Sequence, residues 1–156
     1  MTGVQTCALP ISPRPLCGGG QATGCGALAL LLHNGLGVKQ DDVAAVALFR
    51  KACDGGEMIS CMNLAVAYSN GMQVQRDDAQ AASLNRRACD GGIWASCTVL
   101  GFAYQYGAGV PKDQKQAFIF YGKACEGGEI TGCHNLAYQY QNGEGVPKDQ
   151  DQALAI

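Results

Sequence analysis

Apolar residues recur along this chain at helical spacing, in stripes that return at a fixed interval. The stripe that starts at Cys61 occupies positions i, i+3, i+4 and i+7, which is the pattern of one buried face of an α-helix. We expect each stripe to mark the first helix of a repeated unit. Its members are Cys61, Leu64, Ala65 and Tyr68, then Cys97, Leu100, Gly101 and Tyr104, then Cys133, Leu136, Ala137 and Tyr140; in the first unit Leu32 replaces the tyrosine.

A second stripe follows the first and predicts a second helix in each unit. The well-formed copies are Ala45, Leu48, Phe49 and Ala52 in the first unit and Ala117, Phe120, Tyr121 and Ala124 in the third. The copy in the second unit is weaker and consists of Ala81, Leu84, Asn85 and Ala88. That unit also has Gln73 where the other connectors have glycine, so we expect it to be the least well packed.

Residues typical of helix caps separate the two stripes. Glycine after the last helical residue supplies the left-handed backbone of a C-terminal cap, and aspartate is a preferred N-cap. In three units a glutamine three residues after the aspartate completes a capping-box pattern. The glycines are Gly35, Gly71, Gly107 and Gly143, the aspartates are Asp41, Asp77, Asp113 and Asp149, and the glutamines are Gln80, Gln116 and Gln152.

Eight cysteines form four pairs in one frame, Cys-x7-Cys, and successive frames are 36 residues apart. Residues eight apart in one helix lie about 12 Å apart along its axis, whereas a disulfide needs Cα atoms roughly 4.4–6.8 Å apart. The chain must therefore reverse inside each frame, and Gly-Gly pairs at 55–56, 91–92 and 127–128 supply left-handed positions for the turn. The predicted disulfides are Cys17–Cys25, Cys53–Cys61, Cys89–Cys97 and Cys125–Cys133.

The alternative to these disulfides is reduced cysteine packed as a small hydrophobe. Cysteines paired at fixed spacing favour an oxidising compartment, and hence a periplasmic or secreted protein. A zinc site is disfavoured because there is no Cys-x2-Cys and because the two histidines, His33 and His134, have no ligand-like spacing. We expect no metal and no other cofactor.

Length and charge narrow the picture further. A chain of 156 residues with a period of 36 holds about four units of one repeat array. Its net charge of −2, with 15% charged residues, gives no basic surface for nucleic acid. The longest apolar run, residues 27–32, is too short to span a bilayer. The predicted fold class is all-α, a solenoid of two-helix repeats stapled by disulfides.

The two ends of the chain depart from the repeat. Residues 1–12 resemble a translated sequencing adapter and lack the basic and apolar regions of a signal peptide. We therefore expect residues 1–16, with the unpaired Cys7, to be a non-native or disordered extension, and residues 17–156 to form the array. No cap or stop signal follows the last stripe before Ile156. We expect a truncated last unit and a fragment of a longer array.

The repeated residues resemble the Sel1-like repeat family, relatives of the tetratricopeptide repeats. The motif is A-C-[DE]-G-G-x3-[SG]-C-x2-L-[AG]-x2-Y-x2-G-x-G-V-x2-D, most complete at residues 88–113 and 124–149. The resemblance covers residues 17–156, and the cysteines point to the cysteine-rich bacterial branch. It implies a right-handed α/α superhelix that acts as an adaptor or assembly scaffold. Some cysteine-rich members are described as penicillin-binding, weak β-lactamases, which supplies the alternative function.

The β-lactamase alternative lacks its usual residues in this sequence. A serine β-lactamase needs Ser-x-x-Lys and a later Lys-Thr-Gly. Here Ser60, Ser69, Ser83 and Ser96 are followed three residues on by Asn63, Met72, Arg86 and Val99. There is also no Lys-Thr-Gly, no Gly-x-Ser-x-Gly and no histidine cluster. We therefore favour binding over hydrolysis and assign no catalytic residue.

The candidate binding surface is a row on the first helices that varies between units. Stacked helix pairs form an extended surface, usually lined by their first helices. Asparagine amides can hold the backbone of a bound peptide, and aromatic rings can take its side chains. The predicted binding residues are Asn63, Val66, Asn70, Phe102, Tyr106, Asn135, Tyr138 and Asn142. We expect them to be partly exposed while Leu64, Leu100 and Leu136 are buried, with an ordinary amphipathic exterior as the alternative.

Overall fold

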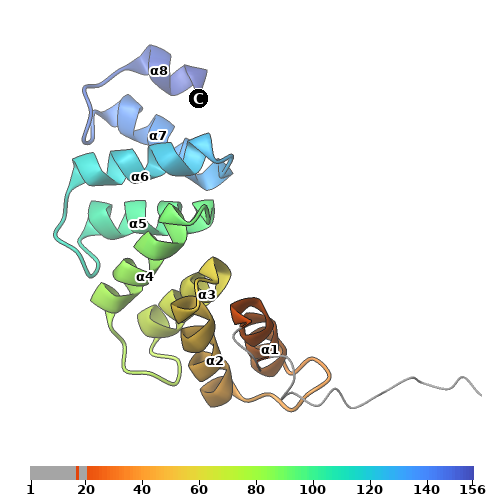
Figure 1. The fold of residues 1–156 in the computed structure, drawn as a ribbon. Coiled ribbons are helices and arrows are strands. Elements are labelled where there is room, and N and C mark those ends of the chain that lie inside the picture. The colour runs from red at the N-terminus through yellow and green to blue at the C-terminus, as the bar shows by residue number, and fades with distance from the viewer. Residues whose placement is uncertain (1–16, 18–20) are drawn as a thin grey trace, which may run out of the picture.

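The computed structural model describes Cys17 and residues 21–156, so the predictions made for residues 1–16, including Cys7, lie outside the described residues. The described chain is all-α, as predicted. Its helices are α1 (Ala22–Asn34), α2 (Asp42–Asp54), α3 (Met58–Asn70), α4 (Asp78–Asp90), α5 (Trp94–Tyr106), α6 (Gln114–Glu126), α7 (Ile130–Asn142) and α8 (Gln150–Ala155). Successive helices pair as hairpins, and the hairpins stack into a curved array with α1 and α8 at opposite ends (Figure 1).

The predicted caps begin and end the helices. Each first helix ends at a glycine with left-handed backbone, from Gly35 at φ 65° to Gly107 at φ 77°. Each second helix begins at an aspartate whose carboxylate accepts a backbone N–H of the first turn, as Asp77 does from Gln80 at 2.9 Å. These contacts satisfy backbone groups that a helix end leaves without an intrahelical partner.

The second half of the capping-box prediction is wrong. In a capping box the glutamine side chain would accept the backbone N–H of the aspartate. Here that N–H is already occupied, because Asp77 donates it to the carbonyl oxygen of Tyr68 at 3.0 Å. The same bond joins Asp113 to Tyr104 and Asp149 to Tyr140. The N-cap is therefore tied to the preceding helix of its own unit, a contact that local sequence spacing does not reveal.

The Gly-Gly corners also differ from the prediction, since only the second glycine is left-handed. Gly92 has φ 89°, whereas Gly91 has φ −87°. The first glycine is needed for close packing: a Cβ on Gly127 would lie 2.2 Å from the ring of Trp94. Gly55 faces Ala22 and Gly91 faces Met58 in the same way. Each of these three corners thus packs against the first residue of the first helix in the unit that it ends.

Four disulfides are present, which confirms the predicted pairing, and three of them close the Gly-Gly corners. They join Cys17 to Cys25, Cys53 to Cys61, Cys89 to Cys97 and Cys125 to Cys133. The Cα atoms of each pair lie 4.3–4.8 Å apart. In the last three pairs the first cysteine lies at the end of one helix and the second near the start of the next. Cys53 and Cys61 are fully buried, whereas Cys125 and Cys133 are half-buried.

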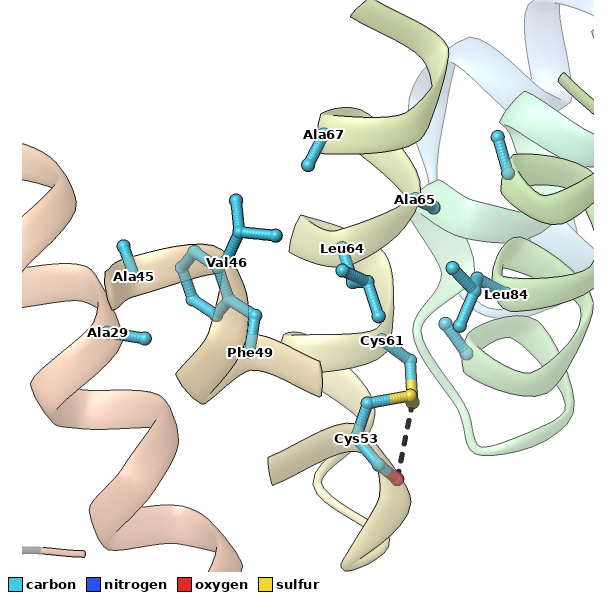
Figure 2. Packing of buried hydrophobic residues seen from close by; sticks show 12 residues of the cluster. Ala29, Ala45, Val46, Phe49, Cys53, Cys61, Leu64, Ala65, Ala67 and Leu84 are labelled. Atoms are coloured by element: carbon cyan, nitrogen blue, oxygen red, sulfur yellow. Dashed lines mark hydrogen bonds between the residues drawn. A yellow bond between two sulfur atoms is a disulfide. The ribbon is translucent and has the colours of Figure 1, made fainter. Parts of the chain in front are cut away.

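The core follows the predicted stripes along the stack. In the cluster shown in Figure 2, Phe49 of α2 packs with Ala29 of α1, and Leu64 of α3 lies close to Leu84 of α4. The weak stripe of the second unit is buried too, with Leu84 8% exposed. Its members differ from those of the other units in size rather than in burial.

The tyrosines of the first stripe are half-buried rather than fully buried. Arg50 of α2 donates to the hydroxyl of Tyr68 and lies over its ring, with the guanidinium carbon 5.8 Å from the ring centroid. Arg86 does the same at Tyr104 one unit later. These cation–π contacts lie at the outer edge of the first two interfaces between units. At the third interface Tyr140 meets Phe118 edge to face instead.

Candidate functional site

An apolar groove lies between α3 and α5, with α4 as its floor. Its volume is about 460 Å³. The lining residues are Met62, Val66, Ser69, Asn70, Asp78, Ala81, Ala82, Asn85, Ala95, Val99, Leu100, Phe102, Ala103, Tyr106 and Ala108. Most of them are apolar, as is typical of sites that bury a ligand side chain.

The groove exists because its floor is built from small residues. In the first unit the two floor positions are Val46 and Phe49, and in the third they are Phe118 and Tyr121. In the second unit the same positions hold Ala82 and Asn85. The Asn85 side chain folds back and donates its amide to the carbonyl oxygen of Ala81 at 3.1 Å, so it leaves the space open.

Exposed apolar side chains form the two walls. Val66 is 45% exposed on α3, and Val99 is 48% exposed on α5. Two aromatic residues continue the α5 wall: Phe102 and Tyr106 stack with nearly parallel rings and centroids 6.3 Å apart. Large apolar residues that share one concave surface mark an interaction site more often than scattered ones do.

A second, polar hollow of about 470 Å³ adjoins the groove, and Phe102 and Tyr106 line both. Its other lining residues are Gln105, Lys112, Gln114, His134, Asn135, Tyr138 and Glu144. The Tyr121 hydroxyl donates to Gln105 at 2.6 Å, and Gln105 in turn donates to Glu144 at 3.4 Å. Burial raises the pKa of Tyr121 and keeps it neutral as a donor.

Two asparagine side chains near this surface differ in how they are satisfied. The side-chain nitrogen of Asn135 is buried and has no hydrogen-bond partner within the described chain. The side-chain nitrogen of Asn142 donates to the carbonyl oxygen of Tyr138 at 2.9 Å and is therefore occupied. Of the two, Asn135 is the one with an unused donor beside the hollow.

The structure brings six of the eight predicted binding residues together. Val66, Asn70, Phe102 and Tyr106 line the groove, and Phe102, Tyr106, Asn135 and Tyr138 line the hollow. The other two, Asn63 and Asn142, line neither. As expected, Leu64 and Leu100 are buried, at 3% and 1% exposed. Leu136 is only half-buried, because α8 is short and covers α7 incompletely.

The floor residues Ala81, Ala82 and Asn85 were not among the predicted site residues. They belong to second helices, whereas the prediction considered only first helices. The signal was present, since a position-by-position comparison of the three second helices shows the loss of bulk at 82 and 85.

Three of the serines considered for the β-lactamase alternative make no hydrogen bond to a side-chain base in the described part of the chain. Ser60 and Ser96 are buried, at 1% and 0% exposed, and their hydroxyls have no partner in the described chain. Ser69 donates to the carbonyl oxygen of Val66 at 3.0 Å. A nucleophilic serine would need a neighbouring base within hydrogen-bond reach.

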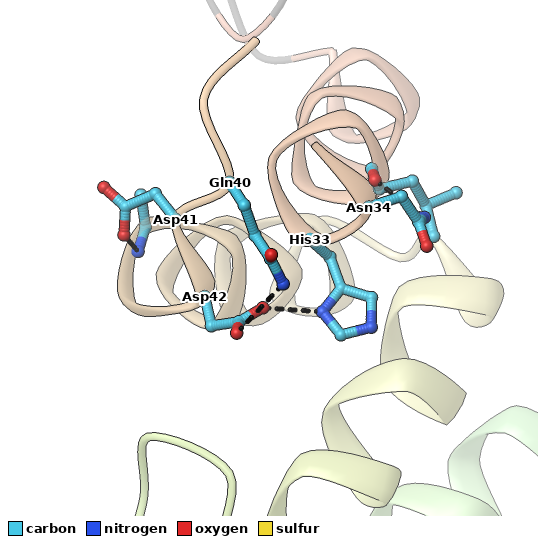
Figure 3. A network of polar contacts seen from close by, with 7 residues as sticks. His33, Asn34, Gln40, Asp41 and Asp42 are labelled. Carbon is cyan, nitrogen blue, oxygen red and sulfur yellow. Dashed lines mark hydrogen bonds and ion pairs between the residues drawn. The ribbon is translucent and has the colours of Figure 1, made fainter. Parts of the chain in front are cut away.

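A histidine–carboxylate pair lies elsewhere, at the end of the first hairpin. His33 Nδ1 lies 2.7 Å from an oxygen of Asp42, and Gln40 reaches the other oxygen at 3.5 Å (Figure 3). No serine or cysteine of the described residues hydrogen-bonds to this imidazole, so the pair links α1 to α2 and lacks a nucleophile.

Within residues 21–156 and Cys17 there is no group of three or more His, Cys, Asp or Glu side chains placed to hold a metal ion. None of the described helices is long and apolar enough to cross a membrane.

Comparison with known families gives one match, repeated along the chain. The family model described as Sel1 repeat matches residues 22–57, 59–93, 94–129 and 130–155. Each matched segment contains one helix hairpin. No curated protein matches the chain.

Several solved structures share the fold. A Sel1 repeat protein from Oxalobacter formigenes is 29% identical, with a TM-score of 0.83, over 87% of this chain and 56% of its own. The antigen c5321, a protective antigen present in uropathogenic Escherichia coli strains, is 33% identical, with a TM-score of 0.82, over 86% of this chain and 29% of its own. Helicobacter pylori cysteine-rich protein B is 27% identical, with a TM-score of 0.64, over 72% of this chain and 86% of its own. The chain thus spans 56% and 29% of the first two relatives.

Proposed function

Because the chain belongs to the Sel1 repeat family, we propose that it is a scaffold that binds a protein or peptide partner along the face formed by α3, α5 and α7. The observation that carries this proposal is the apolar groove between α3 and α5, walled by Val66, Val99 and Phe102. The polar hollow next to it offers amide groups for a peptide backbone. Together they combine apolar contact area with a few polar groups that fix orientation.

A peptide library displayed on phage tests the proposal. We expect the immobilised protein to enrich a set of peptides, and their synthetic forms to bind in a fluorescence-anisotropy titration. The variant Val66→Asp/Val99→Asp places charges on both walls and should weaken binding by more than about tenfold, because a bound side chain would have to desolvate them.

The matched control is Val43→Asp, an equally drastic change at a residue that is 64% exposed on α2 and does not line the groove. It should bind the peptides like the unmodified protein. Failure to enrich any peptide, or equal binding by all three proteins, would contradict the proposal.

We also assign the protein to the periplasm or to secretion, because disulfides of this kind form and persist in oxidising compartments. Four disulfides within the described residues support this assignment. Cells of the source organism should yield protein whose eight paired cysteines resist alkylation until a reductant is added. Alkylation of these cysteines directly on lysis would place the protein in a reducing compartment.

A further inference from the structure

We infer that the groove holds an aromatic side chain of the bound peptide, in the space that a ring of the chain itself fills in the neighbouring units. This inference rests on the proposed binding function and names the kind of residue that anchors the partner. Its evidence is that the equivalent space is filled by a ring in the first and third units and is open in the second.

In the first unit the space is filled from within. Phe49 rises from the floor helix α2 and is 2% exposed, and Val46 beside it is 4% exposed. Phe49 packs in one core cluster with Ala29, which is completely buried on the facing helix. An aromatic ring and an alanine are therefore compatible at these two positions.

In the third unit the same space holds Tyr121, which is fully buried. Its ring meets Phe102 edge to face, with centroids 5.6 Å apart, and its hydroxyl reaches Gln105. The positions that correspond to Phe102 and Gln105 in the second unit are Val66 and Ser69. Both line the groove, so the groove occupies the place of the missing ring.

The electrostatics of the groove favour an uncharged anchor. Asp78 is the one carboxylate that lines it, and its charge is offset by Arg76, whose guanidinium lies 3.0 Å away. A charged side chain would lose its hydration in the groove without gaining a free counter-charge.

The walls favour an aromatic anchor over an aliphatic one. The Met62 side chain offers a polarisable thioether, and Phe102 offers a ring for edge-to-face contact. Ser69 and Asn85 also line the groove, at the positions that Gln105 and Tyr121 occupy in the third unit, where the two side chains hydrogen-bond. A phenylalanine or tyrosine of the partner fits this combination.

The test uses two small probes, N-acetylphenylalaninamide and N-acetylleucinamide. They are titrated into protein that carries ¹³C-labelled methyl groups, and the NMR signals of Met62, Val66 and Val99 are followed. We expect saturable shifts at these methyls and at least about fivefold tighter binding of the phenylalanine amide. Equal affinity of the two amides, or saturable shifts only at other methyls, would overturn the inference.

The decisive variant is Ala82→Val/Asn85→Phe, which gives the second unit the floor of the first. Positions 65 and 85 correspond to Ala29 and Phe49 of the first unit, and residue 65 is alanine as well, so the new ring repeats a pair that packs there. The variant should lose the saturable shifts, whereas the control Ala47→Val, at an exposed position of α2, should retain them. Undiminished binding by the filled variant would overturn the inference. If the filled variant does not fold, Val66→Asp/Val99→Asp serves the same purpose.

Panning the phage library on the unmodified and the filled protein separates the inference from the proposed function. Enriched peptides that carry an aromatic residue and lose binding to the filled variant support both. Peptides without an aromatic residue that bind both proteins equally leave the scaffold function intact and refute the aromatic anchor. Absence of any bound peptide refutes both. A dimer seen by light scattering that dissociates in the filled variant would show that a second copy occupies the groove and would overturn the inference.

Discussion

The guanidinium group of Arg87 donates a hydrogen bond to the carbonyl oxygen of Cys53, 34 residues earlier, at 3.0 Å. Lys51 makes the same contact with the carbonyl oxygen of Cys17 at 3.4 Å. Cys53 lies in the last turn of α2, where carbonyl groups lack helical partners and the helix dipole attracts cations. A basic residue of α2 and one of α4 therefore each hold the preceding disulfide corner.

Replacing Arg87 with methionine should lower the free energy of unfolding by about 1 kcal/mol, since the bond is charge-assisted but the side chain is half-exposed. Arg87→Lys should retain most of this stability. Urea unfolding followed by circular dichroism measures both. The control is Lys115→Met, at an exposed position of α6. It should change the free energy of unfolding by less than about 0.5 kcal/mol. An equal effect of the two methionine variants would show that the contact across units contributes nothing.

Gly37 and Gly109 share the same left-handed backbone, with φ 72°, but differ in their surroundings. A Cβ on Gly109 would lie 2.0 Å from the carbonyl oxygen of Asp78 in the preceding unit, whereas one on Gly37 would meet nothing within 4 Å. Gly37→Ala should therefore cost only the backbone strain, about 1 kcal/mol. Gly109→Ala should cost about 2–4 kcal/mol, because a clash with backbone is added. Thermal and urea unfolding compare the two variants, and similar losses would refute the close approach.

Gln73 is the exception in this series. It has φ 57° at the position where the other three units have glycine, and it is the one non-glycine residue with positive φ in the described chain. Gln73→Gly should raise the free energy of unfolding by up to about 1 kcal/mol by relieving that conformation. Gln75→Gly, in the same connector but at an ordinary φ, should instead lower the free energy of unfolding by about 0.5 kcal/mol. A stabilising effect of both changes would point to the connector as a whole rather than to residue 73.

The features that sequence predicted best are those that follow from spacing along the chain. The helix period, the glycine and aspartate caps and the disulfide frame each depend on neighbours a few residues away, and all were found where expected. The features that sequence missed depend on contacts with another helix of the unit. The first glycine of a corner is explained by the first residue of the first helix in the unit that the corner ends, such as Met58 or Trp94, and the N–H of Asp77 by the carbonyl of Tyr68.

The candidate site also has a part that the sequence predicted and a part that it missed. The walls were found from the first helices, because their faces follow from helical spacing. The floor was not, because a groove depends on what is absent from a position. Ala82 and Asn85 look unremarkable until they are set beside Phe49 and Tyr121, which fill the equivalent space elsewhere in the molecule.

The disulfides should differ in their resistance to reduction. Cys53–Cys61 is fully buried, whereas Cys125–Cys133 is half-buried near the end of the array. Limited dithiothreitol, followed by alkylation and mass spectrometry, should label Cys125 and Cys133 before Cys53 and Cys61, because exchange requires access to a sulfur atom. Simultaneous labelling of both pairs would show that reduction follows global unfolding rather than local access.

Replacing both Cys53 and Cys61 by serine should lower the free energy of unfolding by at least about 2–3 kcal/mol from loop entropy alone.

Phe102 and Tyr138 are similarly exposed, at 37% and 47%, yet they should respond differently to truncation. The Phe102 ring packs edge to face on Tyr121, so Phe102→Ala should lower the free energy of unfolding by about 1–2 kcal/mol. Tyr138→Ala should change it by less than about 0.5–1 kcal/mol, as is usual for a surface residue. Phe102 borders both the groove and the hollow, whereas Tyr138 lines only the hollow.

Both truncations should weaken binding of a library-selected peptide, and Phe102→Ala should weaken it more, because Phe102 contributes to both concavities. Urea unfolding gives the stability of each variant, and anisotropy titrations at low urea give its affinity while each remains folded. A loss of about 3–5 kcal/mol for either residue would identify it as core, since that is the cost of deleting a buried aromatic side chain. Full stability with unchanged affinity would instead mean that the ring is ordinary exterior. Only a folded variant with impaired binding places the aromatic ring in the recognition surface.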